Sequence, residues 1–429
     1  MNILRMLASE RYGADRTLVA VQKVLFLSAC AIWMLYNMLT ASLFAKWIWE
    51  GLSLTKVYFV HTTYLLIALV ELIRIWKGEY GKSDAVCLAI LIIMICGGVF
   101  RDDSGLVCGG LLIYCARKFD MRWVCFTSTC IMTFGLLFVI ACSASGVIQD
   151  IVLGAGKDAS RIRHCLGFRY PLYPAQYLFT ITLVVCWIRA EQIHLWELAL
   201  LAAMNILMYH YTDSRISFFC GILAIIVSLL YRFSMYRRWR SCGLLAVLSL
   251  SFVFACLFTL FMELLYGIDP GNTFINKLNP ALIARIRLGL NGLIEFGVPP
   301  FGQEIPWRGA GLDINGVSYN TTGSPDYANY IDNAFIHIAV EYGWIYAIGI
   351  IALFTVASFK ALKENDDMLV LTMAIIAAHC IIDDLAVRLA FNTLMFTFAG
   401  ILRPLNRVGE RTTDEKHIDD SRPVTYIGP

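Results

Sequence analysis

Residues 24–45, VLFLSACAIWMLYNMLTASLFA, contain no charged side chain. Because the hydrocarbon core of a bilayer takes about 20 mostly apolar helical residues, this stretch predicts a helix that crosses a membrane. Over all 429 residues, 59% are hydrophobic and only 16% are charged, whereas an average soluble domain carries roughly 25% charged residues. The composition excludes a water-soluble enzyme. The net charge of +3 argues against a basic protein that binds nucleic acid.

Similar apolar runs follow along most of the chain, and they predict an all-α polytopic membrane protein of about 12 transmembrane helices. We expect one integral membrane domain over residues 1–402 and a disordered, polar cytoplasmic tail over residues 403–429. Two runs are short enough to be partial or re-entrant helices, namely 104–116 and 388–402. The other expected crossings are 18–44, 57–75, 84–100, 123–142, 173–190, 195–211, 214–231, 241–263, 334–359 and 368–383.

The positions of lysine and arginine predict the orientation, because short cytoplasmic loops carry an excess of both. With both termini in the cytoplasm, all inner loops except the one around Arg189 and His194 are visibly basic. The first apolar run is long and is not followed by a small-residue cleavage pattern, so we expect no cleaved signal peptide. The inner basic residues are Arg5, Arg11, Arg16, Lys77, Lys82, Arg117, Lys118, Arg122, Arg232, Arg237, Arg238, Arg240, Lys360, Lys363, Arg403, Arg407 and Arg411.

Two loops on the predicted outer side, at about 143–172 and 265–332, depart from this charge rule. Both are basic in part, and the second is long and rich in proline and glycine. Long loops without evident secondary structure are commonly functional, so we expect these two extracytoplasmic loops to carry the chemistry. Their basic residues are Lys157, Arg161, Arg163 and Arg169 in the first loop and Lys277, Arg285, Arg287 and Arg308 in the second.

Outward-facing arginines indicate an anionic ligand, and the common anion at a bilayer surface is phosphate. The planar guanidinium donates two parallel hydrogen bonds to phosphate oxygens and keeps its charge. Arg215 belongs with this set, because it lies in a tight outer turn, YHYTDSR, over residues 209–215. The alternative is that these side chains only reach toward lipid headgroups. The expected phosphate-binding residues are Arg161, Arg163, Arg169, Arg215, Arg285 and Arg287.

Four short motifs over about residues 160–345 resemble, in their order, the landmarks of bacterial Wzy-type polysaccharide polymerases. The loop placement and the topology agree with this resemblance, and a weaker similarity extends to Asn392. The motifs are Arg161-x-Arg163-His-Cys-Leu-Gly-Phe-x-Tyr170-Pro171, Tyr211-Thr-Asp-Ser-Arg215, Leu282-x-x-Arg285-Ile286, and Ile331-Asp332-Asn333-Ala-Phe335 with Glu341-Tyr342-Gly343.

The resemblance implies a GT-C-like glycosyltransferase in the bacterial cytoplasmic membrane. Such enzymes join oligosaccharide repeat units carried on undecaprenyl diphosphate into an O-antigen, capsule or exopolysaccharide. The implied partners are this lipid-linked oligosaccharide, membrane lipids and a chain-length regulator, with no cofactor and no metal. O-antigen ligases of the same superfamily carry His where this chain has Asp332, while Asn333, Gly343 and Tyr346 fit the ligase spacing. This departure favours a polymerase over a ligase.

The resemblance also suggests roles for individual residues. Arg215 and Arg285 would stabilise the charge on the leaving diphosphate, and Asp332 would accept or orient the proton of the acceptor hydroxyl. Asn333, His337 and Tyr211 are candidates for supporting the acceptor.

Each role has a structural alternative. Asp332 and Asn333 could instead cap the following helix, and His337 could be a structural histidine. The charged residues Asp383, Asp384 and Arg388 could form a turn with its own ion pair. Alternative functions are an O-antigen ligase and a lipid-linked oligosaccharide flippase or transporter, although transporters usually place their polar groups at the midplane between repeated halves. A non-catalytic scaffold would leave the outward arginines unexplained.

Overall fold

The computed structural model describes residues 2–51, 55–100, 103–154, 162–233, 236–241, 243–278, 280–309, 311–318 and 329–401. The predicted tail over residues 403–429 and the predicted phosphate ligand Arg161 lie outside these ranges.

Among the described residues, helices dominate, and this confirms the predicted all-α membrane class. Six helices are long and apolar enough to cross a bilayer, and two further apolar helices are shorter. The six are α1 (Asn2–Thr40, apolar from Thr17), α3 (Thr55–Trp76), α6 (Met121–Ala144), α9 (Arg215–Arg232), α12 (Ser251–Ile268) and α15 (Trp344–Lys363). The shorter two are α5 (Ser104–Ala116) and α16 (Asp367–Cys380), and α4 (Lys82–Phe100), α7 (Leu172–Arg189) and α8 (Leu195–Thr212) complete the bundle.

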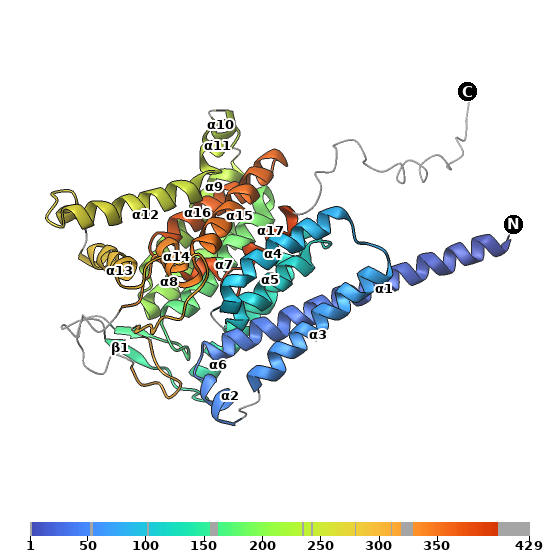
Figure 1. Cartoon of the computed structure of the whole chain (residues 1–429), viewed down its shortest axis with the longest axis horizontal. Coiled ribbons are helices and arrows are strands. Elements are labelled where there is room, and N and C mark those ends of the chain that lie inside the picture. The colour runs from blue at the N-terminus through green and yellow to red at the C-terminus, as the bar shows by residue number, and fades with distance from the viewer. Residues whose placement is uncertain are drawn as a thin grey trace.

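The short elements lie at opposite ends of the bundle (Figure 1). One end carries α2 (Ala45–Gly51), an antiparallel hairpin of β1 (Val152–Gly154) and β2 (Ile162–His164), and α13 (Pro280–Phe296). We call it the loop end. The opposite end carries α10 (Tyr236–Ser241) and α11 (Leu244–Leu248). Helix α7 forms much of the core between them, since most of its side chains are buried against α6, α8 and α9.

The expected single crossing over 334–359 is wrong in one respect, because the chain breaks at Gly343 into α14 (Ala334–Tyr342) and α15. Gly343 has a φ of 89°, a conformation that favours glycine. A Cβ atom at this position would lie 2.6 Å from the carbonyl oxygen of Pro300. The break therefore accommodates the close approach of residues 299–301, to which the backbone of Trp344 is hydrogen-bonded.

Other boundaries also differ from the expectation, and the crossing expected over 241–263 is divided between α11 and α12. The loop predicted over 265–332 contains the 3₁₀ turn η2 (Ile275–Lys277) and the 17-residue helix α13, whose apolar residues Leu282, Ile286 and Leu293 recur at helical spacing. The segment predicted as a crossing over 388–402 consists of the turn η5 (Thr393–Phe396) and the short helix α17 (Thr397–Ile401). It is preceded by the turn η4 (Leu385–Val387), and a further turn, η1 (Ala190–Gln192), follows α7.

Buried ion pairs hold α3, α4 and α5 together at the end away from the loops. The guanidinium of Arg117 donates to Asp84 Oδ1 at 2.7 Å and to both carboxylate oxygens of Glu71 at 2.9 and 3.0 Å. Glu71 also pairs with Arg74 at 2.6 Å. Arg117 and Arg74 are almost completely buried, so each carboxylate depends on these cations for compensation.

We predict that Arg117→Ala lowers the stability of the protein strongly. Removing one partner of a buried ion pair leaves the other charge uncompensated, which costs about 3–5 kcal/mol. Thermal unfolding in detergent should show a clear drop in the midpoint temperature. The neighbouring Lys118 is much more exposed, and its one ion pair among the described residues is with Asp84. Lys118→Ala is therefore the matched control and should cost at most about 1 kcal/mol. Equal midpoints for the two variants would contradict the prediction.

Candidate functional site

An ion pair between α13 and the start of α14 joins two of the predicted catalytic residues. Nε of Arg285 donates to Oδ2 of Asp332 at 2.9 Å, although the residues are 47 positions apart in the sequence. Their side chains are 31% and 32% exposed. A cation and a carboxylate are thus held together in a position that a ligand can reach.

The surroundings of Asp332 change its acidity. Burial raises the pKa of its carboxyl group above the usual value, the neighbouring Arg285 opposes this shift, and the charge of Asp384 adds to it. A raised pKa makes a carboxylate a stronger base. Asp332 therefore has the character expected of a group that accepts a proton.

Asn333, not Asp332, caps helix α14. Its Oδ1 accepts hydrogen bonds from the backbone of Phe335 and Ile336, and its Nδ2 donates to Thr259 Oγ1 and to the carbonyl of Ile381. The capping alternative therefore applies to Asn333 alone and leaves the carboxylate of Asp332 for Arg285. Since every polar atom of the Asn333 side chain is engaged, this residue positions Asp332 and is not placed to bind an acceptor.

We predict that Asn333→Ala destabilises the protein by about 0.5–2 kcal/mol, the usual cost of losing such a cap. Asn333→Ser is the matched variant, because serine also caps helices, and it should recover most of this loss. The midpoints of thermal unfolding in detergent compare the two. An alanine variant as stable as the parent would show that the cap contributes nothing here.

His337 lies in a buried cluster of aromatic and charged side chains. Its Nδ1 is 3.0 Å from the carbonyl oxygen of Ile331, and its Nε2 is 2.6 Å from Oε2 of Glu341. The ring stacks on Trp307 with centroids 5.2 Å apart, and the indole of Trp307 donates to Oε1 of Glu341 at 2.7 Å. Both ring nitrogens are thus occupied, which favours the structural alternative for His337.

Arg388 extends this cluster from the turn that follows α16. Its Nη2 lies 2.6 Å from Asp384 Oδ2, 3.1 Å from the hydroxyl of Tyr330 and 3.1 Å from His337 Nε2. Tyr330 also donates to Asp384 at 3.0 Å. Asp384 and Arg388 therefore form the ion pair considered above, while the side chain of Asp383 accepts a hydrogen bond from the backbone of Leu385.

The first predicted outer loop reaches the same neighbourhood through Arg163. Its Nε donates to the carbonyl of Thr212 at 3.1 Å, and its guanidinium lies 5.8 Å from the ring centroid of Tyr170. Burial, followed by the charge of Asp332, raises the pKa of Tyr170 to about 12, while Arg163 opposes the shift. Tyr170 therefore lies within electrostatic reach of both Arg163 and Asp332.

The remaining predicted residues lie in different settings. Arg215, at the first turn of α9, is 58% exposed and pairs weakly with Asp213 at 3.4 Å. The exposed ring of Tyr211 lies edge-on to His164, and Arg287 is exposed on α13. Arg169 donates instead to the backbone carbonyls of Leu312 and Thr40, which ties separate segments of the loop end together.

A small cavity of about 70 Å³ lies beneath Arg285, between α12, α13 and α14. Asn333 and Thr259 contribute to its wall, together with Glu263, which is 4% exposed. Oε2 of Glu263 has no hydrogen-bond partner among the described residues, and Gly289 of α13 sits directly against this carboxylate. Sequence reasoning assigned Glu263 no role, because the contact with Gly289 depends on how α13 packs against α12.

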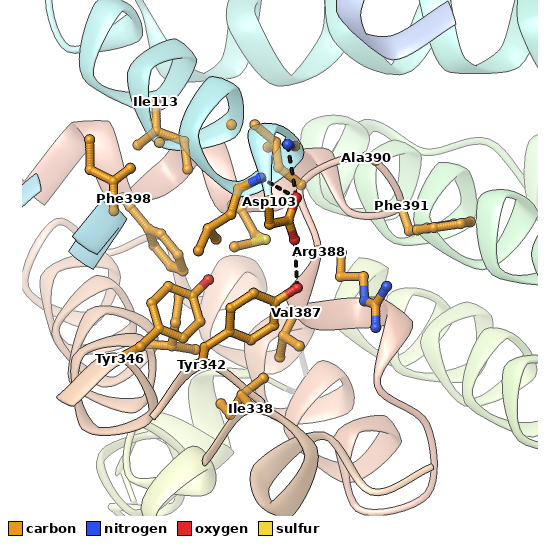
Figure 2. A pocket seen from close by; sticks show the side chains of 18 of the residues that line it. Asp103, Ile113, Ile338, Tyr342, Tyr346, Val387, Arg388, Ala390, Phe391 and Phe398 are labelled. Atoms are coloured by element: carbon orange, nitrogen blue, oxygen red, sulfur yellow. Dashed lines mark hydrogen bonds between the residues drawn. The ribbon is translucent and has the colours of Figure 1, made fainter. Parts of the chain in front are cut away.

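A larger cavity of about 210 Å³ lies on another side of α14 and is lined by residues of α4, α5, α14 and α15, among others. Figure 2 shows its largely apolar wall, with Arg388 and the hydrogen-bonded pair of Asp103 and Tyr342 among the lining side chains. The two cavities share no lining residue.

Comparisons with known proteins add no assignment: no family model, curated protein or solved structure matches this chain. Within the described ranges, no three His, Cys, Asp or Glu side chains converge as metal ligands would. The candidate site is therefore defined by the geometry of its own side chains.

Proposed function

We propose that this protein is a polysaccharide polymerase that joins repeat units carried on undecaprenyl diphosphate, on the outer face of a bacterial cytoplasmic membrane. The observation that carries the proposal is the pair of Arg285 and Asp332. A cation suited to a leaving diphosphate and a carboxylate suited to an acceptor hydroxyl lie 2.9 Å apart, between α13 of the loop end and the start of α14. Tyr170 lies within electrostatic reach of both this carboxylate and Arg163.

In the proposed reaction, a hydroxyl oxygen of the acceptor sugar attacks the anomeric carbon of the donor. The new glycosidic bond forms as the bond from this carbon to the diphosphate oxygen breaks, and undecaprenyl diphosphate leaves. The proton of the hydroxyl passes to Asp332, and Arg285, Arg163 and Arg215 stabilise the charge on the diphosphate. Preorganised cations contribute most in a site that excludes part of the water.

The ion pair between Arg285 and Asp332 suggests the order of these steps. While Asp332 is bonded to Arg285, the cation lowers its basicity. A diphosphate that takes over the guanidinium releases the carboxylate to accept a proton. Binding of the donor would thus activate the base.

An O-antigen ligase is the second candidate function, because Asn333, Gly343 and Tyr346 fit the ligase spacing, although Asp332 stands where ligases carry His. A ligase uses the same kind of donor but transfers the finished glycan to another acceptor. A flippase has less support, because the charged residues described above cluster at the ends of the helices.

Deletion of the gene in its native host distinguishes these functions. For a polymerase, the carrier lipid should hold single repeat units and the long surface polymer should disappear, while restoring the gene restores the polymer. Long chains that remain on the carrier lipid would indicate a ligase. Single units trapped on the inner leaflet would indicate a flippase, and both outcomes would overturn the proposal.

A topology with both termini in the cytoplasm and the loop end on the outer side belongs to the same proposal. A reporter of periplasmic location fused after Gly297, which follows α13, should be active, whereas one fused after Lys363 should be inactive. The opposite pattern would place the candidate site in the cytoplasm.

A further inference from the structure

The larger cavity has the composition of a site for an apolar chain. Most of its wall comes from aliphatic and aromatic side chains of α4, α5, α15 and the turns around η4 and η5. A cavity of roughly 150 Å³ with such a lining admits benzene, so a volume of about 210 Å³ has room for about eight to ten carbon atoms.

The cavity is elongated along the membrane helices. On α5 its lining residues include Gly105, Gly109 and Ile113, each four positions after the last. At 1.5 Å per residue they cover about 12 Å of helix. On α15, the lining residues Tyr346 and Leu353 are separated by a similar length of helix. An extended chain lying parallel to the helices matches this shape.

One end of the cavity is polar and adjoins the candidate site. There, Oδ2 of Asp103 accepts a hydrogen bond from Tyr342 at 2.8 Å, while its Oδ1 caps α5 (Figure 2). Arg388 lines the same cavity, and its Nη2 is bonded to Asp384 and Tyr330. Nε and Nη1 of Arg388 make no hydrogen bond to any other residue that the structure describes, so this edge of the guanidinium is available to an anionic headgroup.

We propose that this cavity binds the isoprenoid chain of a lipid-linked substrate, with the carbons nearest the phosphate between α5 and α15 and the phosphate at Arg388. The inference rests on the proposed function for the identity of the lipid. The cavity is separate from the one beneath Arg285, since the two share no lining residue. A reaction between two carrier-linked substrates requires two lipid sites, and this cavity would supply one of them.

Photolabelling of the full chain in phosphatidylethanolamine–phosphatidylglycerol nanodiscs tests the site directly. The probe is a polyprenyl phosphate with a photoreactive group on an isoprene unit near the phosphate. We expect label on peptides that contain Gly109 and Leu353, removed by excess unlabelled undecaprenyl phosphate but not by excess phosphatidylglycerol. Leu353→Trp should reduce this labelling about tenfold, because small changes in apolar volume alter binding by about 10–200-fold.

Val356→Trp is the matched control, since Val356 lies on the same helix, is 46% exposed and does not line the cavity. It should label like the parent. Equal displacement by phosphatidylglycerol, or labelling that Leu353→Trp leaves unchanged, would overturn the proposal. Labelling does not require turnover. A protein that fails to bind the probe can therefore be distinguished from one that lacks polymerase activity, which the gene deletion tests.

Discussion

Arg285→Ala is expected to abolish long polymer and to leave single repeat units on the carrier lipid. Arg285 is the half-exposed cation paired with Asp332, and the loss of a preorganised group that stabilises transition-state charge costs about 10²–10³ in turnover. Arg285→Lys should restore activity only in part, because lysine lacks the planar fork that binds phosphate with two hydrogen bonds. Chain-length distributions and analysis of carrier-linked glycans measure both effects.

Lys277→Ala provides the control for this experiment. Lys277 is exposed in the same loop region as Arg285 and belongs to none of the contacts that define the site. Its polymer should match that of the parent. Chain lengths unchanged by Arg285→Ala, at normal protein levels in the membrane, would remove Arg285 from the mechanism.

Asp332→Asn is expected to lower turnover by about 10²–10⁴, the usual contribution of general acid–base catalysis. The amide keeps the size of the side chain but cannot accept the proton of the acceptor hydroxyl. Asn333, which holds the start of α14, is unchanged, so the fold should persist. Asp332→Glu retains a base and should keep more activity than the amide. Full activity of Asp332→Asn would show that Asp332 is not the base and that its role is limited to the ion pair with Arg285.

The same residue predicts the pH dependence of the reaction. Only the ionised carboxylate can act as the base, so activity is lost as the pH falls through the pKa of Asp332. Because burial raises this pKa, the acidic loss should begin at a higher pH than for an exposed aspartate. The residual activity of Asp332→Asn should lack this dependence, and initial rates across a pH series compare the two proteins.

The sequence predicted the membrane class because that class depends on composition, which can be assessed without knowledge of any tertiary contact. It placed the crossing over 334–359 as one helix because Gly343 lies within an apolar run, and only the approach of Pro300 explains the break. It missed α13 because proline and glycine flank that helix, although Leu282, Ile286 and Leu293 carried a helical period.

The candidate site was predictable in part. Arg285 and Asp332 were selected as residue types in ordered motifs, but their pairing depends on the packing of α13 against α14. The contacts of His337 with Trp307 and Glu341 and those of Arg388 with Asp384 arise where separate segments fold together. In the sequence, these residues were distinguished only as charged or polar residues next to apolar runs. That pattern is equally typical of an ordinary turn.

The most direct test of the proposed polymerase activity is a reaction with the purified protein alone. The full chain in nanodiscs is supplied with repeat units on undecaprenyl diphosphate from its own host, and products of two or more units are measured together with free undecaprenyl diphosphate. We predict that the two products appear in step, one carrier released for each bond formed, and that Arg285→Ala prevents both. Carrier-linked units that remain single with the parent protein, under conditions in which it stays folded, would contradict the account.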